Sequence, residues 1–123
     1  MRRSDVYALS STRAEGWGVV ANEAISEGCI LVANRQVGSA SMLIRNGETG
    51  FMHENRDVHQ FVRIIESLAA DPGLQDRIRV DAWARMQRLW HPQVGAQRFV
   101  ALCEGLLGIG AMPHYSEGPC SPA

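Results

Sequence analysis

Residues 15–23 read Glu-Gly-Trp-Gly-Val-Val-Ala-Asn-Glu and decide the fold, because a glycine-flanked turn leads there into a helix pattern. Ahead of them, residues 6–9 (Val-Tyr-Ala-Leu) are typical of a buried parallel strand, and residues 10–13 form a polar turn. Behind them, Gly28 is a good C-terminal helix cap, and residues 29–33 (Cys-Ile-Leu-Val-Ala) form an unbroken apolar run. Strand, helix and strand in this order predict a right-handed crossover unit in a parallel sheet.

The same stretch predicts a binding site for a long anionic ligand. We expect the helix to begin at about Trp17, so that free N–H groups and the positive end of the helix dipole near Gly16 and Gly18 favour a diphosphate. Glu15 and Glu23 would stand about 12 Å apart at a rise of about 1.5 Å per residue. This is too far for the paired carboxylates of a glycosidase, which lie about 5 to 9.5 Å apart. Carboxylates at this separation fit the two ends of a nucleotide sugar, the ribose and the sugar beyond the diphosphate.

The second half of the sequence predicts three helices and a tail. Asp57 followed by Gln60 resembles a capping box at the start of the first helix, which ends before residues 71–73 (Asp-Pro-Gly). Its apolar stripe consists of Val58, Phe61, Val62, Ile65, Leu68 and Ala69. A second helix is expected from about Leu74 to Leu89, with Ile78, Ala82, Met86 and Leu89 on one side. A third begins at His91-Pro92, and its apolar face is formed by Gly95, Phe99, Leu102, Cys103, Leu106 and Leu107. We therefore expect one domain over residues 1–107 and a disordered tail over residues 108–123.

Composition excludes several classes of function. The net charge is −1, and no basic run interleaves with aromatic residues, so no nucleic-acid partner is expected. Three widely spaced cysteines argue against a disulfide framework or a zinc site and favour a reducing cytoplasm. No apolar run approaches about 20 residues, so no signal peptide or membrane span is expected. Peripheral contact with the inner membrane face stays open. The four histidines lack metal-ligand spacing and are expected to be structural or at the surface, so no metal is expected.

Taken together, these motifs resemble the GT-B glycosyltransferases of the retaining group 1 (family 4) type. The matching segments are residues 5–11, 15–24, 28–33, 37–39 and 43–52, the last being a glycine-marked turn that leads into a short strand. The resemblance covers roughly residues 3 to 107. It implies an α/β fold, a partial Rossmann-like parallel sheet with flanking helices, which is the C-terminal, donor-binding part of a GT-B enzyme.

The resemblance also implies roles for single residues. Glu23 would hold the ribose hydroxyls, and Glu15, as the catalytic residue, would lie close to the donor sugar or phosphate. The backbone of Gly16, Trp17, Gly18 and Val19 would line the phosphates. Arg13 or Arg35 could supply positive charge, although neither occupies the position of the family's diphosphate clamp. No cofactor is implied, since the substrate is itself a nucleoside-diphosphate sugar. The acceptor, a saccharide or a lipid-linked molecule, would bind through an N-terminal domain outside this sequence.

Two departures from the family pattern bear on activity. The diphosphate clamp of the family, a glycine-arginine turn followed by a lysine, belongs to the half of the domain that this sequence does not contain, and the sequence has no lysine. Ser41-Met42 stand where many relatives have a proline-glutamate pair. We therefore expect the chain alone to be inactive.

Each proposed site residue also has a simpler role. Glu23 taken alone would be a solvated helix residue, and Glu15 a charge that complements the helix dipole. Gly16 and Gly18 would serve only a tight turn, and Trp17 would pack rather than stack on a ligand. Three hypotheses follow: a donor-binding part of a retaining glycosyltransferase, an inactive nucleotide-binding remnant, and a module that self-associates through the last helix and an exposed sheet edge at residues 6–9 or the neighbouring strand.

Overall fold

The computed structural model describes residues 4–12 and 15–122 and divides the chain into two compact units, residues 1–84 and 85–123. The first contains β1 (Val6–Leu9), α1 (Val20–Ser26), β2 (Ile30–Asn34), α2 (Ala40–Leu43), β3 (Phe51–His53), α3 (Val58–Ala70) and α4 (Pro72–Arg85), whose last residue opens the second unit. The second contains a π-helical segment (Met86–Trp90) and α5 (Pro92–Leu106).

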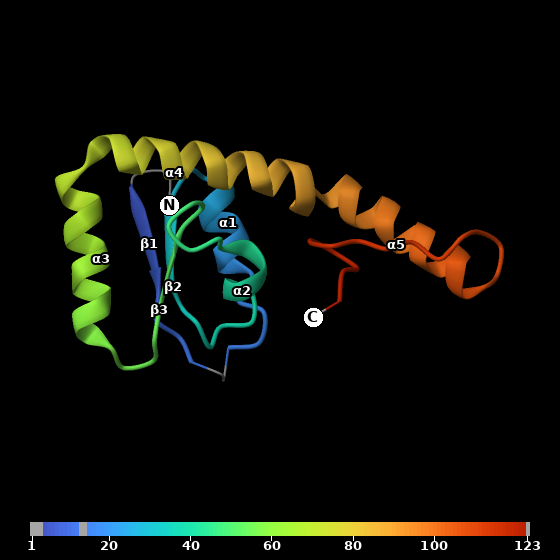
Figure 1. The fold of residues 1–123 in the computed structure, drawn as a ribbon, viewed down its shortest axis with the longest axis horizontal. Helices are drawn as coiled ribbons and strands as arrows, with labels where there is room; N and C mark the ends of the chain where they lie inside the picture. Colours follow the sequence, from blue (N-terminus) through green and yellow to red (C-terminus); the bar gives the residue numbers. More distant parts are fainter. Residues whose placement is uncertain (1–3, 13–14, 123) are drawn as a thin grey trace. The chain divides into compact units, whose positions relative to one another are not determined.

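The first unit is built around a parallel sheet with the order β1-β2-β3. Val6 lies opposite Ile30, and Val32 lies opposite Phe51. Helices α1 and α2 lie on one side of the sheet and α3 on the other (Figure 1). Every residue of β2 is buried, as expected for a parallel strand covered on both faces. The predicted α/β class, a partial parallel sheet with flanking helices, is confirmed.

The core on the α3 side joins the sheet to two helices. Ile30 and Val32 of β2, Leu68 of α3 and Ile78 of α4 are buried together. Phe61, Ile64, Ile65 and Leu74 pack against this cluster while partly buried. The predicted apolar stripe of α3 is confirmed at Leu68, Phe61 and Ile65, but Val58 (66% exposed), Val62 (43% exposed) and Ala69 are exposed.

Helix α1 begins at Val20, three residues later than predicted. The reason is Gly18, whose φ of +74° is left-handed and cannot belong to a right-handed helix. The C-terminal end is as predicted, since Gly28 adopts φ +84° directly after Glu27, the C-cap of the helix. Strand β2 is displaced by one residue from the predicted range and ends at Asn34.

In the second unit, α5 starts at Pro92 as predicted, with His91 as its N-cap. The residues after α5 form turns, and Arg98 donates to the carbonyl oxygens of Glu117 (2.5 Å) and Pro119 (3.2 Å). Arg98 also lies over the ring of Tyr115, 4.3 Å from its centroid. Disorder of residues 108–123 in solution stays a prediction.

Candidate functional site

The loop that carries the predicted site follows β1 and is tied to the turn that follows β2. The N–H of Gly38 donates to the carbonyl of Gly16 at 3.1 Å, and the N–H of Ser39 donates to the carbonyl of Trp17 at 3.0 Å. A Cβ on Gly38 would lie 2.3 Å from the Gly16 carbonyl oxygen, so the two loops approach this closely only because residue 38 is glycine. Both loops leave the carboxyl ends of neighbouring parallel strands, which is where open α/β sheets bind ligands.

The two glycines of the loop have different surroundings. Gly18 is buried in a left-handed conformation, and a Cβ there would lie 3.1 Å from Cγ1 of Val37 and 3.5 Å from Cδ2 of Leu9. A Cβ on Gly16 would meet nothing within 4 Å. The tight-turn role is thus confirmed for Gly18, whereas Gly16 leaves open space beside the backbone.

The structure places the two glutamates at the two ends of the stretch. Glu15 is half-buried, and a Cβ on Gly18 would lie 3.4 Å from Cγ of Glu15, so the Glu15 side chain lies against the loop. Glu23 is exposed in the first turn of α1. Neither glutamate is committed to an ion pair among the described residues. Both carboxylates are therefore available to a ligand.

The remaining predicted site residues are Trp17, Val19, the backbone of Gly18 and Arg13. The indole of Trp17 is 38% exposed, and its Nε1 donates to Oδ1 of Asn22 at 2.8 Å, which holds the ring near the start of α1. Val19 is 61% exposed. Among the described residues, the N–H groups of Gly18 and Val19 have no hydrogen-bond partner. Arg13 lies outside the described residues.

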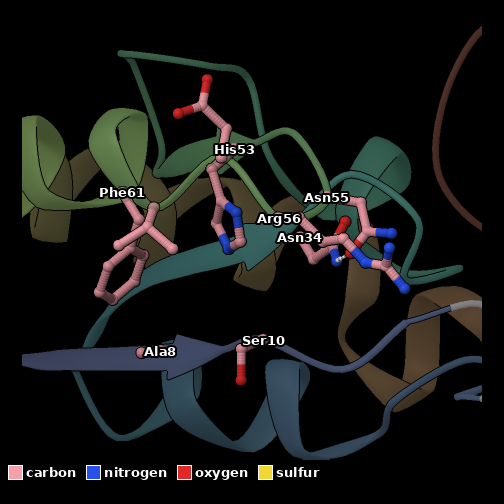
Figure 2. A pocket seen from close by; sticks show the side chains of 9 residues that line it. Ala8, Ser10, Asn34, His53, Asn55, Arg56 and Phe61 are labelled. Carbon is pink, nitrogen blue, oxygen red and sulfur yellow. Dashed lines mark hydrogen bonds between the residues drawn. The ribbon is translucent and has the colours of Figure 1, made fainter.

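A pocket of about 400 Å³ lies elsewhere on the first unit and was missed by the sequence analysis. Its lining residues come from the ends of the three strands and the start of α3: Ala8, Ser10, Asn34, His53, Asn55, Arg56, Asp57, Val58 and Phe61 (Figure 2). The alternation of side chains along a strand was the signal that could have grouped Ala8 and Ser10 on one face. His53 was expected to be structural or at the surface, because the histidines lack metal-ligand spacing and an obvious nucleophile partner in the sequence.

No group of three or more histidine, cysteine, aspartate or glutamate side chains in the described part of the chain is placed to hold a metal ion. None of its helices has the length and apolar character that crossing a bilayer requires.

Comparisons with known proteins place these features in a family. The family model of the glycosyl transferases group 1 matches residues 1–84. No curated protein sequence matches the chain significantly.

Three solved structures share the fold. The C-terminal domain of a glycosyl transferase group 1 family protein (LpcC) from Francisella tularensis has a TM-score of 0.66 at 24% identity, over 72% of this chain and 45% of that chain. HepE from Anabaena, solved in complex with UDP, has a TM-score of 0.73 at 24% identity, over 84% of this chain and 28% of that chain. Sucrose-phosphate synthase from Thermosynechococcus elongatus has a TM-score of 0.64 at 25% identity, over 76% of this chain and 23% of that chain.

The chain thus spans less than half the length of each of these three proteins. The family model, in contrast, covers more than half of the chain, and it includes the whole sheet and the loop of residues 15–23. On this evidence the chain belongs to the group 1 glycosyltransferases and corresponds to part of their C-terminal GT-B domain.

Proposed function

We propose that the chain forms the part of a retaining glycosyltransferase that binds the nucleotide-sugar donor. The observation that carries the proposal is the loop of residues 15–19, held by Gly38 and Ser39 at the carboxyl end of β1, with the exposed Glu23 close behind it in α1. The UDP bound to HepE, a protein with the same fold, supports a nucleoside diphosphate as the ligand.

In this proposal each end of the stretch contacts a different part of the donor. The carboxylate of Glu23 accepts hydrogen bonds from the two ribose hydroxyls, and the N–H groups of Gly18 and Val19 donate to the diphosphate. Gly16 leaves room for a phosphate to approach the backbone. Glu15 lies near the sugar and completes the contacts to the donor.

The reaction would break the bond between the anomeric carbon and the diphosphate oxygen and form one to an acceptor hydroxyl oxygen, whose proton is released. Donors aimed at the departing diphosphate stabilise its developing charge. The acceptor, a saccharide or a lipid-linked molecule, would be bound by a part of the enzyme that this chain does not span. Turnover is therefore proposed for the longer enzyme, and binding for this chain.

The test is a titration of the full chain with UDP, GDP and ADP, followed by protein-observed NMR. We expect saturable shifts at residues 15–23 with at least one of the three. Glu23→Ala should weaken binding by about 10- to 100-fold, the loss expected for hydrogen bonds to a charged group. Glu66→Ala is the matched control, because Glu66 is also an exposed glutamate on a helix, α3. If none of the three nucleotides produced shifts, the donor site would be refuted.

A further inference from the structure

The pocket of about 400 Å³ lies on the face of the sheet opposite to the loop of residues 15–19. Side chains alternate along a strand, so Leu9 and Ala8 point to opposite faces of β1. Leu9 lies against Gly18 on the α1 side, whereas Ala8 lines the pocket together with Phe61 of α3. The pocket and the loop of residues 15–19 therefore lie on opposite faces of the sheet, at the carboxyl ends of the same strands.

His53 supplies the observation that points to a ligand. Its side chain lines the pocket, the residue is 6% exposed, and among the described residues its Nε2 has no hydrogen-bond partner. Figure 2 shows its ring directed toward the space above Ala8 and Ser10. A buried polar atom without a partner costs free energy, so an orphaned atom at a cavity wall marks a place where a bound group would complete the site.

The hydrogen bond at Nδ1 of His53 determines whether Nε2 requires a donor or an acceptor as its partner. Nδ1 of His53 lies 3.0 Å from the carbonyl oxygen of Glu54, which can only accept, so Nδ1 carries the proton. In the neutral ring Nε2 is then an acceptor. The ring of Phe61 packs edge-on at a centroid distance of 5.4 Å and holds this orientation. The missing partner is therefore a donor, such as a hydroxyl group.

The rest of the lining alternates donors and acceptors beside an apolar wall. Asn34 donates from Nδ2 to Oδ1 of Asn55 at 3.3 Å, which leaves the Nδ2 of Asn55 available as a donor. Ser10 can donate or accept. Ala8, Val58 and Phe61 form the apolar side of the pocket.

The charges at the pocket balance one another. Glu54 forms an ion pair with Arg35 at 2.7 Å, so these two charges offset each other. Arg56 has no ion-pair partner among the described residues, and the nearby Asp57 carries the opposite charge while capping α3. Arg56 also holds a φ of +64°, a conformation that non-glycine residues rarely adopt and that is common at functional sites. One cation beside one carboxylate favours a ligand without net charge.

We propose that this pocket binds a neutral saccharide unit of hexose size. A hydroxyl donates to Nε2 of His53, other hydroxyls bond to Asn55, Arg56 and Asp57, and the C–H face of the ring packs on Phe61. The volume lies near the lower end of the range of about 300–1,000 Å³ that small-molecule sites occupy. A ligand this small, held by few hydrogen bonds, binds in the millimolar range.

The test is an NMR titration of the full chain with glucose, galactose and mannose. We expect saturable shifts at residues 53–57 with at least one sugar, together with a shift of the ¹⁵N signal of His53 Nε2 as it accepts a hydrogen bond. Shifts without saturation for all three sugars, or shifts confined to residues 15–23, would overturn the proposal. Inorganic phosphate and glucose 6-phosphate are parallel probes, and tighter binding of either one than of every neutral sugar would also overturn it.

Two pairs of variants separate loss of the site from loss of the fold. His53→Gln keeps an acceptor near the position of Nε2, whereas His53→Asn keeps only a polar group near that of Nδ1. We expect His53→Asn to weaken sugar binding at least about tenfold and His53→Gln to retain most of it. Arg56→Gly relieves the left-handed backbone and should lose affinity without losing thermal stability, with exposed Arg63→Gln on α3 as its control. Unchanged affinity in both His53→Asn and Arg56→Gly would refute the assignment.

Discussion

Gly18 and Gly16 stand two residues apart in one loop but meet different physical demands. We expect Gly18→Ala to lower the free energy of unfolding by about 1–2 kcal/mol, because alanine pays a penalty in the left-handed region. The contact with Val37 at 3.1 Å adds to this loss. Gly16→Ala should change the free energy by less than about 0.5 kcal/mol, since nothing lies within 4 Å of its Cβ position. Urea unfolding of both variants measures the difference, and equal losses would contradict the assigned roles.

The sequence could predict these glycines as a group but not their separate roles. Gly18 is demanded by local backbone geometry, which a glycine next to a helix start already indicates. Gly38 is demanded by the approach of the Gly16 carbonyl from a loop that lies about 20 residues earlier, a contact that only the fold creates. The orphaned Nε2 of His53 has the same origin, because its surroundings are assembled from three strands and a helix.

At the scale of elements, Asp57 determines where α3 begins. Its Oδ1 accepts from the N–H of Gln60 at 2.8 Å and so satisfies one of the free donors of the first turn. Asp57→Ala should therefore cost about 0.5–2 kcal/mol of stability, whereas Asp57→Ser keeps a capping oxygen and should lose less. Thermal unfolding of the two variants checks this. A serine variant as unstable as the alanine variant would show that the cap is not the cause.

The sequence predicted an element correctly where the signal is local, and less well where the structure depends on a tertiary contact. The residue pair Asp57 and Gln60 predicted the start of α3 correctly, because a cap is a local interaction. The reciprocal half of the capping box is absent among the described residues, since Oε1 of Gln60 accepts instead from the N–H of Glu54 at 2.7 Å. Helix α2 was not predicted, because its four residues are too few to show a helical period.

At the scale of the whole molecule, the sequence predicted the apolar face of α5 but not how much of it is exposed. The sequence predicted an apolar face on this helix that includes Phe99 and Leu106. In the structure α5 has no buried residue in its described length, and Phe99 and Leu106 are 62% and 69% exposed. A periodic pattern identifies which side of a helix is apolar, but not whether a partner covers it. The pattern therefore predicted the helix α5 but not whether its apolar face is covered.

We propose self-association through the open edge of β1 as the second candidate role of this chain. In the described sheet β1 has β2 as its one neighbour, so its other edge can pair with a second copy. The N–H of Ile30 donates to the carbonyl of Asp5, and because bonding alternates along a parallel strand, Tyr7 also faces β2 while Ala8 presents its N–H to the open edge.

Ala8→Pro should therefore remove a donor from the open edge and keep the bonds to β2, since proline is tolerated on edge strands. We expect the wild-type chain to form dimers with rising concentration in sedimentation velocity, and the variant to stay monomeric with its circular dichroism spectrum preserved. Val80→Ser is the control, because Val80 is exposed on α4 and the change removes apolar surface away from the β1 edge. A proline at this position would break the helix and is not used. Dimers that persist in Ala8→Pro would place self-association on another surface, whereas their loss in that variant alone would assign it to the β1 edge.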